Sequence, residues 1–177
     1  MKIKTRFPNE RDLDAQAVKQ LCMLVNDVYD DAERGLWKVS DSRTNAQEIE
    51  KLLREKALIL AEKDGRIVGS AHVQPWGKDA IELGMLVADR QYRNCGIGSS
   101  LMEAIEAFAH RKNVTIIRLE LLTPRTWLHP SKEFLKNWYT RLGFCPETVE
   151  FFEKMHPEKA AHLATECDFT VWIKRLG

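Results

Sequence analysis

The chain has 177 residues and a mass of 20.5 kDa, about the size of one globular domain, and its apolar fraction of 44% suffices for a core without a disulfide or metal staple. The 27 basic and 26 acidic residues nearly cancel to a net charge of +1, which speaks against nucleic acid as a partner. The four cysteines form no C-x-x-C pair, which predicts free thiols, and the histidines lack H-E-x-x-H spacing, which predicts no metal site. The sequence has no apolar run of about 18 residues, so no membrane span is expected. Together these features predict a cytoplasmic protein.

The first part of the chain predicts a strand followed by a long helix. Asn9 is placed to cap that helix. The pattern breaks over residues 29–40, and a short helix is expected over 46–55. The apolar face of the long helix repeats at Leu13, Ala17, Leu21, Leu24 and Val28.

The rest of the chain predicts alternating strands and helices over a mixed sheet, which is an α/β pattern. Turn signals at 63–66 and 76–79 separate the first strands. Strands are expected over 57–62, 67–73, 81–88 and 115–122, helices over 96–112 and 131–142, and a closing strand pair around 151–152 and 169–173.

A glycine-containing loop precedes the helix that is expected over 96–112. Gly96 and Gly98 stand at its N-terminus, where backbone N–H groups lack helical partners and the dipole favours an anion. Arg93 adds a charge that pairs with phosphate. The loop is no P-loop, because G-x-x-x-x-G-K-[ST] is absent, and Leu101 replaces the third glycine of a dinucleotide fingerprint. The pattern therefore favours a phosphate-bearing ligand of another kind.

Two motifs carry a family resemblance. The stretch ADRQYRNCGIG over 88–98 resembles the acyl-CoA loop of the GNAT superfamily of acetyl-CoA-dependent N-acetyltransferases. NWYTRLGF over 137–144 is similar to the family's aromatic-Tyr-x-x-x-Gly-Phe segment. The resemblance implies that residues 1–177 form a single GNAT-like domain, with a mixed, mostly antiparallel central sheet, helices on both faces, and splayed central strands at the acyl-CoA site.

The resemblance also implies acetyl-CoA as cofactor and CoA as product. The loop would wrap the pyrophosphate through backbone N–H groups, and the preceding strand edge would pair with the pantetheine arm. Lys132 stands where the family often has Asn, and it either contacts a phosphate or is simply solvated. The implied cofactor-binding residues are Leu86, Val87, Ala88, Arg93, Asn94, Cys95, Gly96, Ile97, Gly98, Ser99 and Lys132.

Acyl transfer from a thioester to an amine needs a group that takes the amine proton and a group that protonates the thiolate. In a regular pleat Glu82 and Gly84 share one strand face, opposite Ile81, Leu83 and Met85. By resemblance Glu82 is the expected base, with Gly84 leaving room beside it, although a strand-end Glu is also a common surface residue. Tyr139 is the expected acid, with a purely packing role as the alternative. Its helix has an apolar face of Phe134, Leu135, Trp138 and Leu142.

The early loop over residues 30–37 is expected to receive the acceptor, because members of the superfamily vary there. Glu33 is expected to attract a cationic amine and Trp37 to pack against it; the alternative is an ordinary solvated loop with a core Trp. The predicted partner is a small-molecule amine, with a homodimer as an option.

The predicted activity is N-acetylation of an amino acid, polyamine or amine-bearing toxin in a ternary complex. The alternatives are a noncatalytic acyl-CoA-binding or sensing module, a protein N-terminal or lysine acetyltransferase, and a nicotinamide-binding protein.

Overall fold

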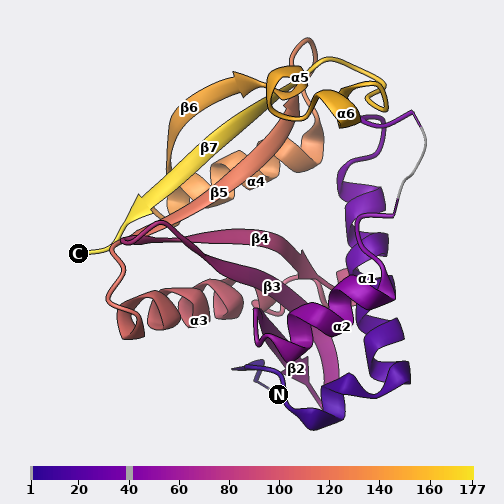
Figure 1. Ribbon diagram of the computed structural model, residues 1–177, viewed down its shortest axis with the longest axis vertical. Helices are drawn as coiled ribbons and strands as arrows, with labels where there is room; N and C mark the ends of the chain where they lie inside the picture. The colour runs from indigo at the N-terminus through magenta and orange to yellow at the C-terminus, as the bar shows by residue number, and fades with distance from the viewer. Residues whose placement is uncertain (1, 39–41) are drawn as a thin grey trace.

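Seven strands form one sheet in the computed structural model, which describes residues 2–38 and 42–177 (Figure 1). Their spatial order is β1-β2-β3-β4-β5-β7-β6, and every neighbouring pair is antiparallel except β4 and β5. This arrangement confirms the predicted mixed, mostly antiparallel sheet. The strands are β1 (Lys4–Arg6), β2 (Leu58–Lys63), β3 (Arg66–Trp76), β4 (Ala80–Ala88), β5 (Ile116–Pro124), β6 (Cys145–Phe151) and β7 (Cys167–Arg175).

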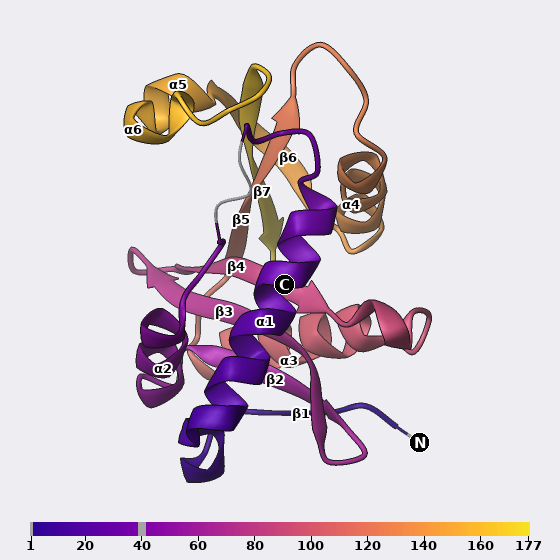
Figure 2. The same ribbon diagram turned by 90° about the vertical axis from the view of Figure 1, so that its right-hand side faces the viewer.

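Helices cover both faces of the sheet (Figures 1 and 2). On one face α1 (Ala15–Ala32) and α2 (Ala46–Arg54) enclose an apolar cluster with β2 and the end of β4. On the other, α3 (Ile97–Arg111) and α4 (Pro130–Arg141) pack on the larger core cluster. None of the helices in the described ranges is long and apolar enough to cross a bilayer. The short helices are η1 (Glu10–Leu13), η2 (Arg90–Tyr92), α5 (Phe152–Met155) and α6 (Pro157–Ala160).

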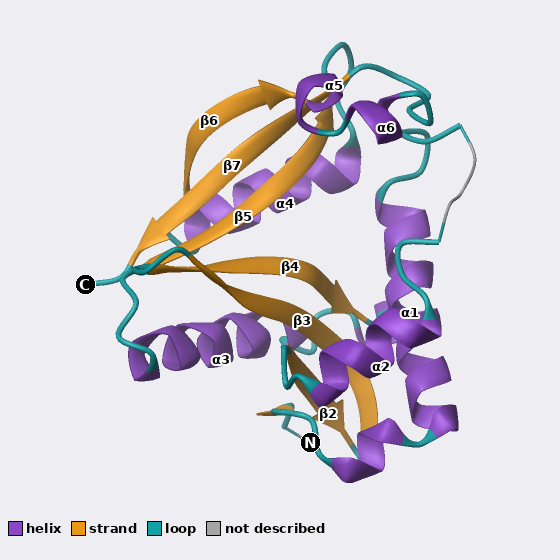
Figure 3. Ribbon diagram, viewed as in Figure 1, coloured by secondary structure: helices purple, strands orange, loops and turns teal. Residues whose placement is uncertain are grey.

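The two parallel strands at the centre diverge. Residues Ala80–Leu83 of β4 pair with Ile116–Leu119 of β5, and the ladder ends there. Beyond this point β4 runs on beside β3, whereas β5 runs on beside β7. Figure 3 shows the resulting wedge between the two strands. The predicted splay of the central strands is therefore confirmed, and it opens toward the loop that enters α3.

A β-bulge reverses the faces of β4 at Met85. Leu83 packs in the core cluster that contains α3, whereas Met85 and Val87 pack against α1 and α2. The register with β3 shifts here, and Met85 has a φ of +42°. One extra residue in one strand sends the following side chains to the opposite face. The prediction that Met85 shares the face of Leu83 is therefore wrong. Glu82 and Gly84 precede the bulge, and their alternation with Leu83 holds.

The long helix begins later than its predicted cap. Asn9 caps only the short η1, and Asp14 caps α1 by accepting hydrogen bonds from the backbone N–H groups of its first turn. Two capping residues follow one another in this stretch, and periodicity alone does not tell which one starts the long helix. The buried face of α1 is Val18, Leu21 and Val25.

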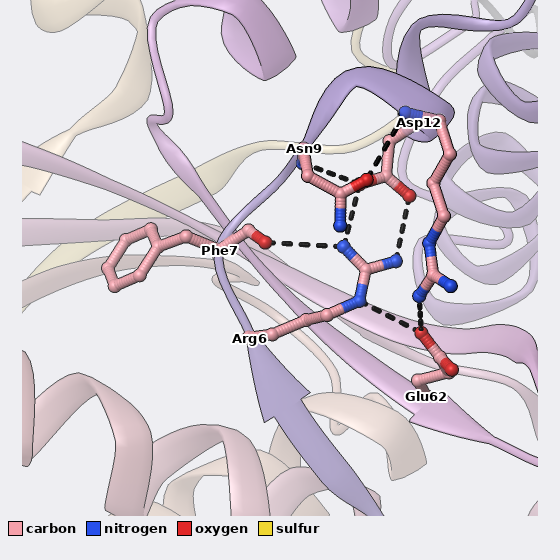
Figure 4. Close-up of polar contacts among 6 residues, drawn as sticks. Arg6, Phe7, Asn9, Asp12 and Glu62 are labelled. Carbon is pink, nitrogen blue, oxygen red and sulfur yellow. Dashed lines mark hydrogen bonds and ion pairs between the residues drawn. The ribbon is translucent and has the colours of Figure 1, made fainter.

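Arg6 joins β1 to η1 and β2 through hydrogen-bonded ion pairs (Figure 4). Its guanidinium donates to the Asp12 carboxylate at 2.6 and 2.8 Å and to Glu62 at 2.9 Å. The backbone N–H of Asn9 donates to the same Asp12 carboxylate at 2.8 Å. Burial acts to raise the pKa of Asp12, but the hydrogen bonds from Arg6 and Asn9 outweigh it and lower that pKa overall. This network fixes the first strand at the sheet edge.

The C-terminal end of α1 and the following segment lie against the last part of the chain. The helix continues to Ala32, so the predicted break at residue 29 is wrong; residues 39 and 40 of that break lie outside the described residues. The Ala164 N–H donates to the Leu36 carbonyl at 2.8 Å, and the Lys38 N–H donates to the His162 carbonyl at the same distance. Leu36 is fully buried in a third apolar cluster. The early segment therefore closes over the open end of the sheet.

Candidate active site

A cavity of about 1000 Å³ lies where β4 and β5 separate. Three parts of the fold wall it: the C-terminal half of α1, the diverging strands, and the inner face of α4. The segment from α5 to residue 162 closes its far side. Side chains with polar or titratable groups in the lining include Asp27, Tyr29, Glu33, Arg43, Glu120, Lys132 and Tyr139.

Tyr139 reaches this cavity from α4 and is 6% exposed. Its ring packs against Trp138, Phe144 and Trp172 at centroid distances of 5.2, 5.6 and 6.4 Å. Burial raises the pKa of the phenol above its ordinary value of about 10, and the nearby Tyr29 adds to the effect, so the group keeps its proton at neutral pH. Within the described residues its oxygen has no hydrogen-bond partner. The phenol is thus both packed and available as a donor.

The other residues of α4 follow the predicted face only in part. Leu135, Trp138 and Leu142 pack against the main core, as expected. Phe134 is 62% exposed, so its prediction as a core residue is wrong. Lys132 takes its place inside, because α4 is turned so that its first turn faces the cavity.

The glycine loop enters α3 with an open backbone. Gly96 is the N-cap, has a φ of +77°, and offers no side chain to cap the first N–H groups. A Cβ on Gly98 would lie 3.1 Å from the Trp138 ring, so the absence of a side chain lets α3 and α4 meet. Arg93, Asn94, Cys95 and Ser99 are exposed around the same turn, and Ile97 is anchored in the core.

The strand edge predicted for the pantetheine arm borders the wedge. Val87 and Ala88 pair with β3 on one side, Leu86 lies in the bulge, and on the other side all three lie beyond the last residue that pairs with β5. Leu86 lines the cavity, and Val87 is buried under α1 and α2. Ala88 ends the strand, and η2 and the glycine loop follow it. Leu86 and Tyr139 therefore line the same cavity, whereas none of residues 87–99 is among its lining residues.

Glu82 lies at the closed end of the wedge and not among the residues that line the cavity. Its carboxylate forms an ion pair with Arg118 on β5 and accepts a hydrogen bond from the Gln74 amide at 2.8 Å. Arg118 also donates to Glu120 at 2.7 Å and stacks on the Trp76 ring at 3.9 Å. Glu120 is the carboxylate of this cluster that lines the cavity. The sequence predicts only Glu82, because β5 pairs with β4 through a parallel register that no local pattern reveals.

Lys132 is buried, with 4% of its side chain exposed, so the solvated alternative is excluded. Its ammonium donates to one Glu33 oxygen at 2.8 Å. The other Glu33 oxygen accepts a hydrogen bond from the Trp37 indole at 2.7 Å. The Trp37 ring meets Phe152 edge-on. Glu33 and Trp37, predicted to meet the acceptor, thus hold the start of α4 against the segment after α1.

Asp31, near the C-terminal end of α1, is also neutralised. Asp31 forms ion pairs with Arg34 at 3.0 Å and with Arg90 at 2.5 Å. Arg90 belongs to η2, which links the end of β4 to the glycine loop. Pairing of this kind weakens the field that an amine would feel, since the opposite charges are fixed within a few ångström.

Tyr29 and Arg43 were not singled out by their sequence pattern. Both line the cavity on the α1 side, with the Arg43 guanidinium 5.0 Å from the centroid of the Tyr29 ring. Burial raises the pKa of Tyr29, opposed by the Arg43 charge and a hydrogen bond with the Met85 backbone. The one available signal was the helical spacing of Tyr29 with Val25, which extends the apolar face of α1 by a turn.

Comparison with known proteins identifies relatives. The model of the acetyltransferase (GNAT) family matches residues 23–144. No curated protein matches the chain. Among solved structures, a GNAT-family acetyltransferase from Streptococcus pneumoniae is 18% identical, with a TM-score of 0.67 over 99% of this chain and 100% of the other. A ribosomal-protein-alanine N-acetyltransferase from Brucella melitensis is 17% identical, with a TM-score of 0.69 over 98% and 99%. N-acetylglutamate synthase from Neisseria gonorrhoeae, solved with coenzyme A and N-acetyl-glutamate, is 17% identical, with a TM-score of 0.65 over 100% of this chain and 36% of the other.

Proposed function

Because the chain belongs to the acetyltransferase (GNAT) family, we propose that it transfers an acetyl group from acetyl-CoA to a primary amine of a small molecule in a ternary complex. The acceptor class is an amino acid, a polyamine or an amine-bearing toxin. The whole of residues 1–177 serves as one catalytic domain, a proposal supported by the single sheet that takes strands from both ends of the chain.

The observation that carries the proposal is the wedge between β4 and β5, which opens onto a cavity holding Tyr139. A thioester-bearing arm needs a slot with an unpaired strand edge, and a pyrophosphate needs free backbone N–H groups. The residues fit acetyl-CoA in both respects. A Cβ on Gly96 would meet nothing within 4 Å, so the turn is open on its outer side. The residues proposed to hold the cofactor are Leu86, Val87, Ala88, Arg93, Asn94, Cys95, Gly96, Ile97, Gly98 and Ser99. Lys132 is left out of this set, because its buried ammonium is already held by Glu33.

When bound, acetyl-CoA supplies an activated acyl group as a thioester. The chain's own part is to orient the amine and to move protons. Tyr139 is the proposed donor to the departing sulfur, supported by its protonated phenol without a partner in the described residues. Glu82 stays a prediction for the base, since its carboxylate is already held by Arg118 and Gln74. Glu33, Trp37 and Gly84 stay predictions for acceptor contacts.

The test is release of free thiol from acetyl-CoA in the presence of amino acids, polyamines, an amine-bearing antibiotic and a peptide with a free N-terminus. Turnover with a small amine that falls in Tyr139→Phe supports the proposal. CoA binding without turnover for any amine points to a sensing module, and turnover with the peptide alone points to a protein acetyltransferase. The matched control is Tyr92→Phe, which removes a phenol from η2 that does not line the cavity.

A further inference from the structure

His72 stands on β3 directly beside Gly84, the residue at which the wedge opens. The two residues pair across the strands, and the next pair along is Gln74 with Glu82. Side chains of paired residues project to the same face of a sheet. A Cβ built on Gly84 would lie 3.9 Å from Nδ1 of His72, so the imidazole lies next to a residue that lines the cavity, although His72, like Glu82, is not itself among the lining residues.

The His72 ring is half-buried and uncommitted. Neither ring nitrogen has a hydrogen-bond partner among residues 2–38 and 42–177. The ring nitrogens are not among the fully buried polar atoms that lack a partner in the described ranges, so they remain accessible to water. By contrast, both Glu82 oxygens are engaged by Arg118 and Gln74. A proton acceptor needs a free lone pair, and the His72 imidazole has one, whereas Glu120 accepts from Arg118 through one of its two oxygens.

The surroundings of His72 favour a neutral ring. Burial lowers the pKa of His72, and this outweighs the raising effect of the charges of Glu48 on α2 and Glu55 at its C-cap. Arg43, before α2, lowers it further. On the sheet itself, the next pair along the two strands carries the Glu82 carboxylate, which forms an ion pair with Arg118. A neutral imidazole at pH 7 is ready to accept a proton, whereas a protonated one is not.

We propose that His72 is the proton acceptor for the amine, reached directly or through one water at the opening beside Gly84. This inference rests on the proposed function. The imidazole nitrogen takes one proton from the ammonium, and the freed nitrogen lone pair forms the bond to the acyl carbon. The carbon–sulfur bond breaks with its electron pair on sulfur, and Tyr139 protonates that sulfur. The substrate nitrogen then loses a second proton, which returns to the Tyr139 oxygen and restores the phenol. His72 gives the proton that it took to water.

Kinetics of His72→Gln and Glu82→Gln over a pH series separate the two candidates for the base. The wild-type protein should lose kcat/KM for the amine as pH falls through a pKa below about 6.5, the ordinary value for His. His72→Gln should lower kcat by about 100-fold or more and abolish that limb. Imidazole added to His72→Gly should restore part of the rate. His110→Gln, an exposed residue at the end of α3, is the matched control and should behave as wild type.

A second readout needs no turnover. In ¹³C-histidine NMR the resonance missing from His72→Gln identifies His72 among the five histidines. It should titrate below the ordinary value in the wild type. Gly84→Ala adds a methyl at an ordinary contact distance, so it should shift this resonance, leave the other four in place, preserve CoA affinity, and lower turnover.

If His72→Gln keeps the fall of kcat/KM at low pH and Glu82→Gln loses it, the inference is overturned and the proposed function stands. An unshifted His72 resonance in Gly84→Ala would also overturn it. Absence of turnover in the wild type with every amine would instead reject the proposed function itself.

Discussion

The buried ion pair between Lys132 and Glu33 permits a test of what Lys132 does. In Lys132→Met the Glu33 carboxylate, 14% exposed, keeps only the Trp37 indole as a partner. In Glu33→Gln the Lys132 ammonium, 4% exposed, loses its carboxylate. Each single change thus leaves one charge without its counterion in a place that water hardly reaches. The double change Lys132→Met/Glu33→Gln leaves neither.

The size of the effect follows from that difference. Removing one member of a buried pair costs about 3 to 5 kcal/mol, whereas replacing both members by neutral groups is often close to neutral. In a chain of this size about 3 to 5 kcal/mol corresponds to a fall in Tm of about 6 to 20 °C. The double variant should therefore be more stable than either single variant, with a coupling energy of about 3 kcal/mol.

The assay is urea unfolding followed by circular dichroism for the wild type, both single variants and the double variant, with CoA affinity measured by calorimetry. We expect lower midpoints in the single variants with an unchanged m-value, and CoA affinity in Lys132→Met close to wild type. Lys132→Met with wild-type stability and clearly weaker, salt-dependent CoA binding would refute the reasoning and assign Lys132 to a cofactor phosphate. Additive losses in the double variant would refute the ion pair as the cause.

Three further outcomes are expected. Tyr139→Phe should lower kcat by about 100-fold or more while leaving CoA affinity unchanged, because only the proton donor is removed; equal kcat values in a thiol-release assay would contradict this. Gly98→Ala should weaken CoA binding and cost about 1 to 3 kcal/mol of stability, because the new methyl meets the Trp138 ring at 3.1 Å; calorimetry and urea melts measure both. The lowered pKa of Asp12 means that its ion pair with Arg6 stabilises the fold above the unfolded pKa of about 3.9, and that this contribution is lost as pH falls through the lower folded value. Urea midpoints of Asp12→Asn should therefore be lower at pH 7 and less sensitive to acid, and parallel pH profiles for both proteins would be the contrary result.

The elements that the sequence predicts well are those with strong local patterns. The helix after Gly96 and the strand ending at Ala88 lie within a residue of their predicted bounds, since turn chemistry and apolar runs are local. The family motifs in turn predict the wedge and the glycine loop. The bulge at Met85 escaped prediction, because an extra residue is visible only against the partner strand.

Long-range pairing accounts for what the sequence misses at the site. The role of Glu82 as a base is predicted from the pattern of its own strand. Whether its carboxylate can accept a proton depends on Arg118, which the parallel pairing of β4 with β5 brings alongside from another part of the chain. The same holds for Lys132 and Glu33, which are far apart in sequence and meet only in the folded chain. Charged side chains that the sequence would place in solvent therefore form ion pairs with one another in the folded chain.

β7 lies between β5 and β6 in the sheet but comes last in the chain, so the cavity wall that β5 forms depends on a strand that is synthesised last. β5 pairs with β4 along four residues and with β7 along all nine. Because β7 is synthesised after α4, β6, α5 and α6, β5 receives most of its backbone hydrogen bonds late, after a long loop has closed. The wall that β5 supplies is thus a late product of folding. In native-state hydrogen exchange the β5 amides from Glu120 onward should open together with the β6–β7 hairpin and independently of β4.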